Sequence, residues 1–288
     1  MYLEALPFLG CPLHPAAGLV LVEIRTTAPD GAILRGRMRC SQCGRRYSIN
    51  DGVLDLLGPL ALPGSPAQFT NALALTAWGY ERFWRPRALP LLTGQPLGYT
   101  YELPLIAGLA APQRGGLFVD VACSNGLYAR TLERLRAGAT GVTVGIDHSW
   151  PMLRQARAFA LAEGLRISYV RAKAQALPFP TGSVVGLTMG GALNEIGDVE
   201  RALAEWRRTL APDGRGVMMN LVQAESRAGR MLQRLLTRGG VAFWRLDDLN
   251  RRYAAAGLRL RAQWQYGVVV FSLLVAHQAD RPVPTSSC

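Results

Sequence analysis

The sequence predicts an α/β protein: a doubly wound, mostly parallel sheet of seven strands, Rossmann-like, preceded by a small N-terminal β segment and a helical cap. Three observations predict it. From residue 115 onward, short apolar runs alternate with amphipathic runs, which is typical of a parallel sheet with helices on both faces. Two successive predicted strands have an acid at or near their carboxyl ends, next to small residues, and four Cys and His residues near the N-terminus are spaced as metal ligands.

The composition is that of a folded protein. Of the 288 residues, 49% are hydrophobic and 18% are charged, a balance that excludes a disordered chain. No apolar run approaches the roughly 20 residues of a membrane-spanning helix. Residues 1–15 (MYLEALPFLGCPLHP) lack the basic start of a signal peptide. We therefore expect a cytoplasmic protein without membrane insertion.

The chain is basic, with a formal net charge of +12. Such a charge raises the hypothesis of nucleic-acid binding. The 32 lysines and arginines include a single lysine, Lys173, a skew that resembles the codon usage of a GC-rich genome. Residues 1–58 hold six arginines against five acids, so the N-terminal segment is no more basic than the rest. Charge alone therefore does not define an RNA-binding face.

Residues 1–58 form the first predicted domain. The runs at residues 19–24 (LVLVEI) and 32–38 (AILRGRM) predict strands, and residues 28–31 (APDG) predict the turn of a hairpin. Residues 59–66 are rich in Pro and Gly and predict a linker. The pattern up to residue 112 is helical, so residues 59–112 are interpreted as linker and cap, and residues 113–288 as the main domain.

The main domain contains seven predicted strands and four predicted helices. The strands cover residues 117–122, 142–147, 167–171, 184–189, 217–221, 258–264 and 268–276, and the helices cover residues 128–137, 152–162, 199–210 and 246–256. No helix separates the last two strands. They are therefore expected to form an antiparallel hairpin at one edge of the sheet.

A zinc site is predicted from the N-terminal cysteines. Cys11 and His14 share a C-x-x-[CH] spacing with Cys40 and Cys43. Two such pairs supply the four N and S ligands of tetrahedral Zn²⁺. Because all four positions are filled by protein ligands, a structural role is expected, and a small domain gains folding free energy from such a metal. The alternative is two unrelated pairs, or a ribbon without its metal.

A nucleoside site is predicted at the carboxyl edge of the main sheet. The first strand leads into residues 119–126 (VDVACSNG), and the second ends in residues 144–147 (VGID). Small residues in the first turn allow the backbone to approach a ligand, and an acid at the second strand tip can accept both ribose hydroxyls. This arrangement favours a nucleotide-like cofactor.

In this order, the motifs resemble those of class I S-adenosylmethionine-dependent methyltransferases. The family pattern D-x-G-x-G-x-G corresponds to residues 120–126, G-x-D-x-S-x-x-M-L to 145–153, D-A-x-x-L-P-F to 173–179 and L-x-P-G-G to 210–214. The resemblance covers residues 113–277 and implies S-adenosylmethionine as cofactor. The cofactor-binding residues that it implies are Asp120, Ala122, Ser124, Asn125, Gly126, Asp147, His148, Met152, Ala174, Gln175 and Gly190.

Two departures from the family pattern affect the cofactor site. Ala122 and Ser124 stand where the family has glycines. Lys173 replaces the acid that commonly accepts the adenine amino group, and a lysine has only donors. Either Gln175 or the backbone near Ala174 replaces that contact, or cofactor binding is weakened by roughly 1.5–3 kcal/mol. A non-catalytic protein of the same fold, binding a partner instead of a substrate, is therefore one alternative function.

The N-terminal segment resembles zinc ribbons that precede several methyltransferases. Residues 40–57 carry the pattern C-x-x-C-G-x-x-Y-x-x-x-D-G-x-x-D-L-L, and residues 78–86 (WGYERFWRP) resemble a helix of plastid-type methyltransferase-like proteins, which also carry a ribbon. Ribosomal RNA guanine-N1 methyltransferases share ribbon and methyltransferase domain, with a different metal spacing. Methylation of rRNA is the runner-up function, with RNA as a second partner.

The leading prediction is methyl transfer to a small, apolar or aromatic metabolite. After the fourth strand, Asn194 and Glu195 occupy positions where many small-molecule methyltransferases carry a histidine, so they are the candidate catalytic residues, with Glu195 as the candidate base. Trp78, Tyr80 and Trp84 are candidate walls of the substrate pocket. The sequence leaves the substrate identity and the oligomeric state open.

Overall fold

We analysed a computed structural model, which describes residues 1–58, 90, 92–95, 98–136 and 138–277. Its elements follow the chain in an N-terminal group and a main group. The N-terminal elements are η1 (Leu3–Phe8), β1 (Gly10–Cys11), β2 (His14–Thr27), β3 (Ile33–Cys40), β4 (Arg46–Asn50) and β5 (Val53–Asp55). The main elements are α4 (Tyr99–Ala110), η3 (Pro112–Arg114), β6 (Gly116–Val121), α5 (Leu127–Leu135), β7 (Gly141–Asp147), α6 (Trp150–Ala162), β8 (Ile167–Arg171), β9 (Val184–Gly190), η4 (Ala192–Asn194), α7 (Val199–Thr209), β10 (Leu210–Leu221), α8 (Arg227–Arg238), α9 (Leu246–Ala255), β11 (Leu258–Tyr266) and β12 (Val269–Ala276).

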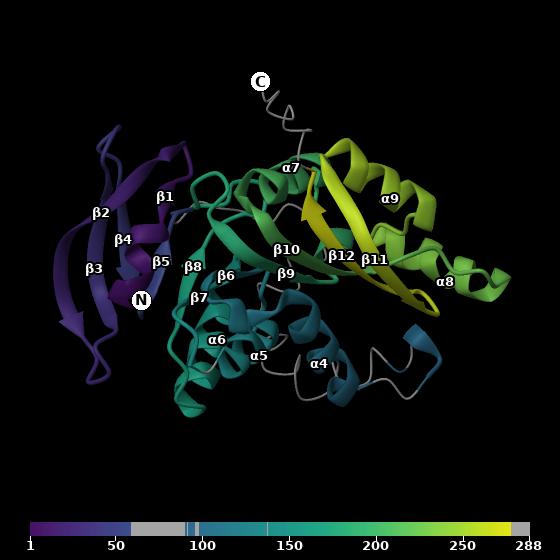
Figure 1. Ribbon diagram of the computed structural model, residues 1–288, viewed down its shortest axis with the longest axis horizontal. Helices are drawn as coiled ribbons and strands as arrows, with labels where there is room; N and C mark the ends of the chain where they lie inside the picture. Colours follow the sequence, from purple (N-terminus) through teal and green to yellow (C-terminus); the bar gives the residue numbers. More distant parts are fainter. Residues whose placement is uncertain (59–89, 91, 96–97, 137, 278–288) are drawn as a thin grey trace, which may run out of the picture.

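The main sheet has the predicted doubly wound form. Its strands lie in the order β8-β7-β6-β9-β10-β12-β11, with parallel pairs from β8 to β10. The β11–β12 hairpin is antiparallel and closes one edge, as predicted. Helices α4, α5 and α6 cover one face, and α7 and α9 cover the other (Figure 1). The alternation of strand and helix in the sequence is thus confirmed.

The sheet does not stop at β8: beyond the seven strands of the main part, it continues into the strands of the N-terminal segment. Strands β2 to β5 form an antiparallel meander, and β5 then pairs in parallel with β8, with Val53 opposite Tyr169 and Asp55 opposite Arg171. The described residues form one sheet of 12 strands. An edge strand exposes unpaired N–H and C=O groups, and β5 satisfies those of β8. The domain boundaries at residues 58 and 112 remain predictions.

Arg171 joins the two parts of this sheet by its side chain as well. It is 7% exposed. Its Nη1 lies 3.2 Å from Asp55 Oδ1 and donates to the Gly58 carbonyl at 2.8 Å, and its Nε donates to the His148 carbonyl at 2.9 Å. A buried guanidinium with these partners is stable only while all of them are in place.

The predicted cap falls only in part on described residues. Helix α4 lies in its C-terminal part and packs its buried Ile106 and Ala110 against the sheet face formed by β6, β10 and β12. Trp78, Tyr80 and Trp84 lie outside the described residues. In the described part of the chain, no helix is long and apolar enough to cross a membrane.

We predict that Arg171→Met destabilises the protein by about 3–5 kcal/mol, because it leaves the Asp55 carboxylate without its buried partner. Urea unfolding would measure the loss. The matched control is Arg114→Met, which breaks the more exposed Arg114–Asp213 ion pair and should cost about 1 kcal/mol or less. Equal losses in the two variants would contradict the role given to Arg171.

Candidate active site

The turn between β6 and α5 is shaped to approach a ligand with its backbone. Ala122, Ser124 and Gly126 all have left-handed backbones, with φ of 53°, 49° and 79°. Gly126 then precedes the first residue of α5. A Cβ atom on Gly126 would lie 2.8 Å from Tyr169 Oη, so a side chain does not fit there. Ala122 and Ser124 adopt this conformation although an L residue is strained in it.

Asp147 ends β7 and fixes this turn from the neighbouring strand. Its Oδ2 accepts a hydrogen bond from Ser124 N at 2.9 Å, and its Oδ1 accepts one from Ser149 N at 2.8 Å. Ser149 in turn begins α6 as its N-cap. His148 Nδ1 also lies 3.3 Å from Oδ1. A carboxylate has about four acceptor sites, so acceptor capacity remains for a ligand hydroxyl. The structure thus places Asp147 at the carboxyl end of β7, beside the turn, and its role toward a ligand stays a prediction.

Asp120 lies beneath the turn and braces it. Its Oδ1 accepts a hydrogen bond from Thr188 Oγ1 at 2.9 Å, and its Oδ2 accepts one from Ala129 N at 3.0 Å. Burial raises the pKa of this carboxyl to about 7. The side chain therefore connects β6, β9 and α5 from inside the protein.

A cleft of about 400 Å³ opens beside Asp147 at the carboxyl edge of the sheet, which is the size range of small-molecule sites. Among the predicted cofactor-binding residues, Ala122, His148, Ala174 and Gln175 also line it. Other lining residues were not predicted from the sequence, namely Leu57, Arg171, Ala172, Ala176, Ile196, Gly197, Asp198 and Arg201. Leu57 comes from the N-terminal segment, and no local motif marks it.

The remaining predicted cofactor-binding residues support this edge of the sheet. Ser124 Oγ lies 3.3 Å from Met152 Sδ, and Met152 is buried. Asn125 is buried and accepts a hydrogen bond from Arg130 Nη1 on its carbonyl at 2.7 Å. At Gly190, the last residue of β9, a Cβ atom would lie 2.9 Å from the ring of Tyr128. The Tyr128 hydroxyl donates to the buried Glu102 carboxylate, a pair that the sequence analysis did not identify.

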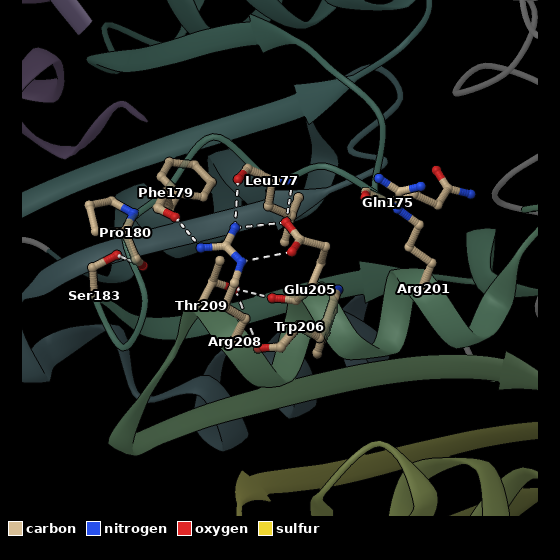
Figure 2. A network of polar contacts seen from close by, with 10 residues as sticks. All are labelled: Gln175, Leu177, Phe179, Pro180, Ser183, Arg201, Glu205, Trp206, Arg208 and Thr209. Carbon is tan, nitrogen blue, oxygen red and sulfur yellow. Dashed lines mark hydrogen bonds and ion pairs between the residues drawn. The ribbon is translucent and has the colours of Figure 1, made fainter. Parts of the chain in front are cut away.

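The loop after β8 forms one wall of the cleft and is anchored from below by α7 (Figure 2). Arg208 donates to the Leu177 carbonyl at 2.8 Å and to the Phe179 carbonyl at 2.7 Å, while it pairs with Glu205 at 2.7 Å. Glu205 also accepts from Leu177 N at 2.8 Å. The ion pair between Arg208 and Glu205 therefore orients both side chains, and their three hydrogen bonds to the backbone hold the loop.

Lys173 lines the cleft at the position of the family's acid. Gln175, expected as a substitute, donates its side-chain amide to the Gly197 carbonyl, and its own carbonyl accepts from Arg201 Nε at 3.1 Å. The adjacent Asp198 lines the same cleft and begins α7 as its N-cap. Besides Asp147, Asp198 is thus a second carboxylate that lines the cleft, and it can accept a hydrogen bond, which Lys173 cannot.

Asn194 and Glu195 lie after β9 as predicted, but Asn194 is committed to the backbone. Its Nδ2 donates to the carbonyls of Leu221 and Ala242 at 2.8 and 2.6 Å, and its Oδ1 accepts from Leu221 N at 2.9 Å. This side chain connects the ends of β9 and β10. Glu195 is half-buried and follows η4.

The four predicted metal ligands meet in space. The ligand atoms of Cys11, His14, Cys40 and Cys43 lie within 4.8 Å of one another. Cys11 Sγ is 3.9 Å from His14 Nδ1. Burial opposes ionisation of Cys40, but hydrogen bonds from the backbone of Cys43 and Gln42 outweigh it and lower the pKa of this thiol to about 6. The thiolate is the metal-binding form, so the cluster fits a tetrahedral N/S site.

Known proteins with similar sequences define the class. Residues 119–218 match the family described as "Methyltransferase domain". The chain is 30% identical over 230 residues to the demethylmenaquinone methyltransferase of Thermus thermophilus, covering 72% of this chain and 94% of that protein. These matches place the chain among proteins of the methyltransferase family. The chain belongs to the class I methyltransferase family.

Other relatives match less of their length. An uncharacterized chloroplastic methyltransferase of Arabidopsis thaliana, At2g41040, is 33% identical over 64% of this chain and 53% of its own length. The 2-phytyl-1,4-naphtoquinone methyltransferase of Trichormus variabilis is 31% identical over 59% of this chain and 63% of its own. The chain thus spans about half of the plastid relative. Since relatives occur in bacteria and chloroplasts, a cytoplasmic location remains a prediction.

Solved structures share the fold. A chain from the complex between the Haloferax volcanii Trm112 methyltransferase activator and the putative methyltransferase aligns with a TM-score of 0.53 and 18% identity. The alignment covers 76% of this chain and 100% of that chain. At this identity the likeness concerns the fold alone.

We predict that Arg208→Met weakens the binding of S-adenosylhomocysteine about tenfold, or about 1.4 kcal/mol, because the loop after β8 loses its anchor. Titration calorimetry would measure the affinity. The matched control is the neighbouring Arg207→Met, since Arg207 donates to the His277 carbonyl instead. An unchanged affinity in Arg208→Met, or an equal loss in the control, would contradict the prediction.

Proposed function

We propose that the protein transfers the methyl group of S-adenosylmethionine to a small, apolar aromatic acceptor of the quinone type. The observation that carries this proposal is the cleft at the carboxyl edge of the sheet, with the Asp147 carboxylate held between two backbone N–H groups. The acceptor class is supported by the relatives named as methyltransferases of demethylmenaquinone and of 2-phytyl-1,4-naphtoquinone.

The residues of the cleft fit the cofactor by their chemistry. Asp147 has acceptor capacity for a ribose hydroxyl. The turn at residues 122–126 presents backbone without large side chains to the amino-acid part of the cofactor. His148, Ala174 and Gln175 lie where the adenine is expected, and Asp198 supplies an acceptor that Lys173 lacks. The cofactor contributes an electrophilic methyl carbon on a sulfonium.

The protein's part in the reaction is alignment and proton removal. The acceptor must lie in line with the methyl carbon, and the end of β9 with Gly190, Asn194 and Glu195 is the proposed location. Glu195 is the proposed base, since a hydroxyl or ring carbon of a reduced quinone loses a proton on methylation. Asn194 holds the backbone around it. Trp78, Tyr80 and Trp84, outside the described residues, are proposed walls of the acceptor pocket.

The experiment is a methyl-transfer assay with labelled S-adenosylmethionine and a reduced, short-chain naphthoquinone. We expect label in the quinone. Asp147→Asn should weaken cofactor binding at least tenfold, because one acceptor oxygen becomes a donor. Glu195→Gln should keep cofactor affinity and lower kcat by about 10²-fold or more. Asp213→Asn, at an exposed position on β10, is the control and should change neither.

Other results of this assay would overturn the proposal. Label in ribosomal RNA instead of the quinone would favour the runner-up, an rRNA guanine-N1-type methyltransferase. Absence of cofactor binding in folded protein would favour the non-catalytic, partner-binding alternative. If the protein binds the cofactor but transfers no methyl group to any reduced quinone, the proposed acceptor class is excluded and the proposed cofactor is not.

We further propose that Cys11, His14, Cys40 and Cys43 hold a structural zinc ion, with S and N distances that a tetrahedral site allows. Metal analysis should find about one zinc per chain. Cys43→Ser should lose it and unfold at a lower temperature, because metal binding adds to folding free energy. Cys288→Ser is the control and should keep the metal. If the protein contains no zinc and a chelator does not change its unfolding temperature, the proposed zinc site is wrong.

A further inference from the structure

Helix α8 is attached to the protein by few contacts. It follows β10 and lies at the end of the molecule opposite the N-terminal strands (Figure 1). Within α8, all of which the structure describes, Gln233 is the buried side chain. Its amide oxygen accepts from Ala224 N at 2.8 Å, and its Nε2 donates to the Val222 carbonyl at 2.9 Å. A polar side chain thus holds the helix in place instead of an apolar face.

The apolar face of α8 points away from the protein. Met231, Leu232, Leu235 and Leu236 are between 43% and 68% exposed. They stand outside the three apolar clusters of described residues. Their spacing of one, four and five residues places them on one side of the helix. Exposed apolar faces of this kind mark contact sites.

A row of arginines runs beside this face. Arg227, Arg230, Arg234 and Arg238 are spaced three, seven and eleven residues from the first and so share a side of the helix. Residues 227–240 contain no acid. Arg230 donates to the Ala224 carbonyl, while Arg227, Arg234 and Arg238 are exposed. The helix therefore combines an apolar face with four positive charges along its length of about 18 Å.

We propose that α8 lies on the surface of an anionic membrane, with its apolar face at the boundary of headgroups and acyl chains and its arginines on lipid phosphates. A short helix with a cationic side, an apolar side and low mean hydropathy is the form that binds in this position. Each arginine near an anionic surface adds to the affinity. The charge of the helix selects this partner over an uncharged apolar surface. Contact of this kind is reversible and needs no spanning helix.

The position of α8 suggests a role for the membrane contact in delivering the acceptor; this role rests on the proposed function. The segment after α8 returns to the carboxyl edge of the sheet, where Ala242 N donates to the Asn194 carbonyl at 2.6 Å and Trp244 forms a bridge with Val222. Helix α8 is thus tied to the backbone beside Glu195. A lipophilic acceptor leaves the membrane next to the site that methylates it.

The test measures membrane binding without methyl transfer, so that its failure is distinct from a failure of the proposed function. Full-length protein is mixed with vesicles of phosphatidylcholine alone, or of phosphatidylcholine and phosphatidylglycerol, and bound protein is recovered by flotation. We expect binding to the anionic vesicles that weakens with salt. R234Q/R238Q should weaken it roughly 30-fold, and L232Q/L235Q at least tenfold.

Matched variants control for charge and for apolar exposure elsewhere. R259Q/R261Q removes two exposed arginines of β11, and L135Q/L161Q changes two exposed leucines of α5 and α6. Both should bind vesicles like the unchanged protein. Circular dichroism and the unfolding temperature show whether each variant is folded.

Three outcomes would overturn the proposal. If the α8 variants and the control variants lose vesicle binding equally, the binding depends on the overall charge of the protein and not on α8. The protein could instead form a concentration-dependent dimer that dissociates in L232Q/L235Q, and show no vesicle binding. The apolar face of α8 would then be a contact with a second copy of the chain. A monomer that does not bind anionic vesicles would show that α8 is not a membrane-binding helix.

Discussion

The buried guanidinium of Arg171 is the contact on which the two parts of the molecule depend. It lies where β5 meets β8, so the ion pair with Asp55 and the bond to Gly58 hold the N-terminal segment onto the main sheet. Its Nε reaches the His148 carbonyl, next to the acid that orders the cleft. Because Leu57 lines the same cleft, the N-terminal segment also forms part of the cleft. The zinc ion that we propose for this segment would therefore also support the cleft.

The cleft shows how a departure from a family pattern is accommodated. Ala122 and Ser124 replace glycines yet keep positive φ, at a cost of roughly 1–2 kcal/mol for each residue. The bond from Ser124 N to Asp147 and the contact of its hydroxyl with Met152 offset part of this cost. The backbone geometry of the turn is thus retained by its neighbours. At residue 173 the chemistry itself changes, and the nearby carboxylate is that of Asp198 instead.

Much of the fold and part of the site could be predicted from the sequence. Strand and helix alternation is a local signal, and the observed β8 spans the predicted residues 167–171. The cluster of Cys11, His14, Cys40 and Cys43 could also be predicted, because two short C-x-x-[CH] spacings indicate it in the sequence. The pairing of β5 with β8 joins residues more than one hundred positions apart, and no local pattern encodes it. Arg171 has no motif of its own. Helix α8 was missed although its apolar residues have helical spacing, because glycines and arginines interrupt the run.

Asn194 illustrates why position alone does not define a role. It follows β9, where sequence reasoning expects a catalytic group, and the structure places it there. Its three side-chain bonds go to the backbone of Leu221 and Ala242. Those bonds fix the end of β10, which precedes α8, and the segment that returns from α8 at Ala242. The same amide therefore orders the proposed acceptor side and the base of α8. Glu195, the next residue, is half-buried and is the side chain proposed as the base, while Asn194 holds the edge of the sheet.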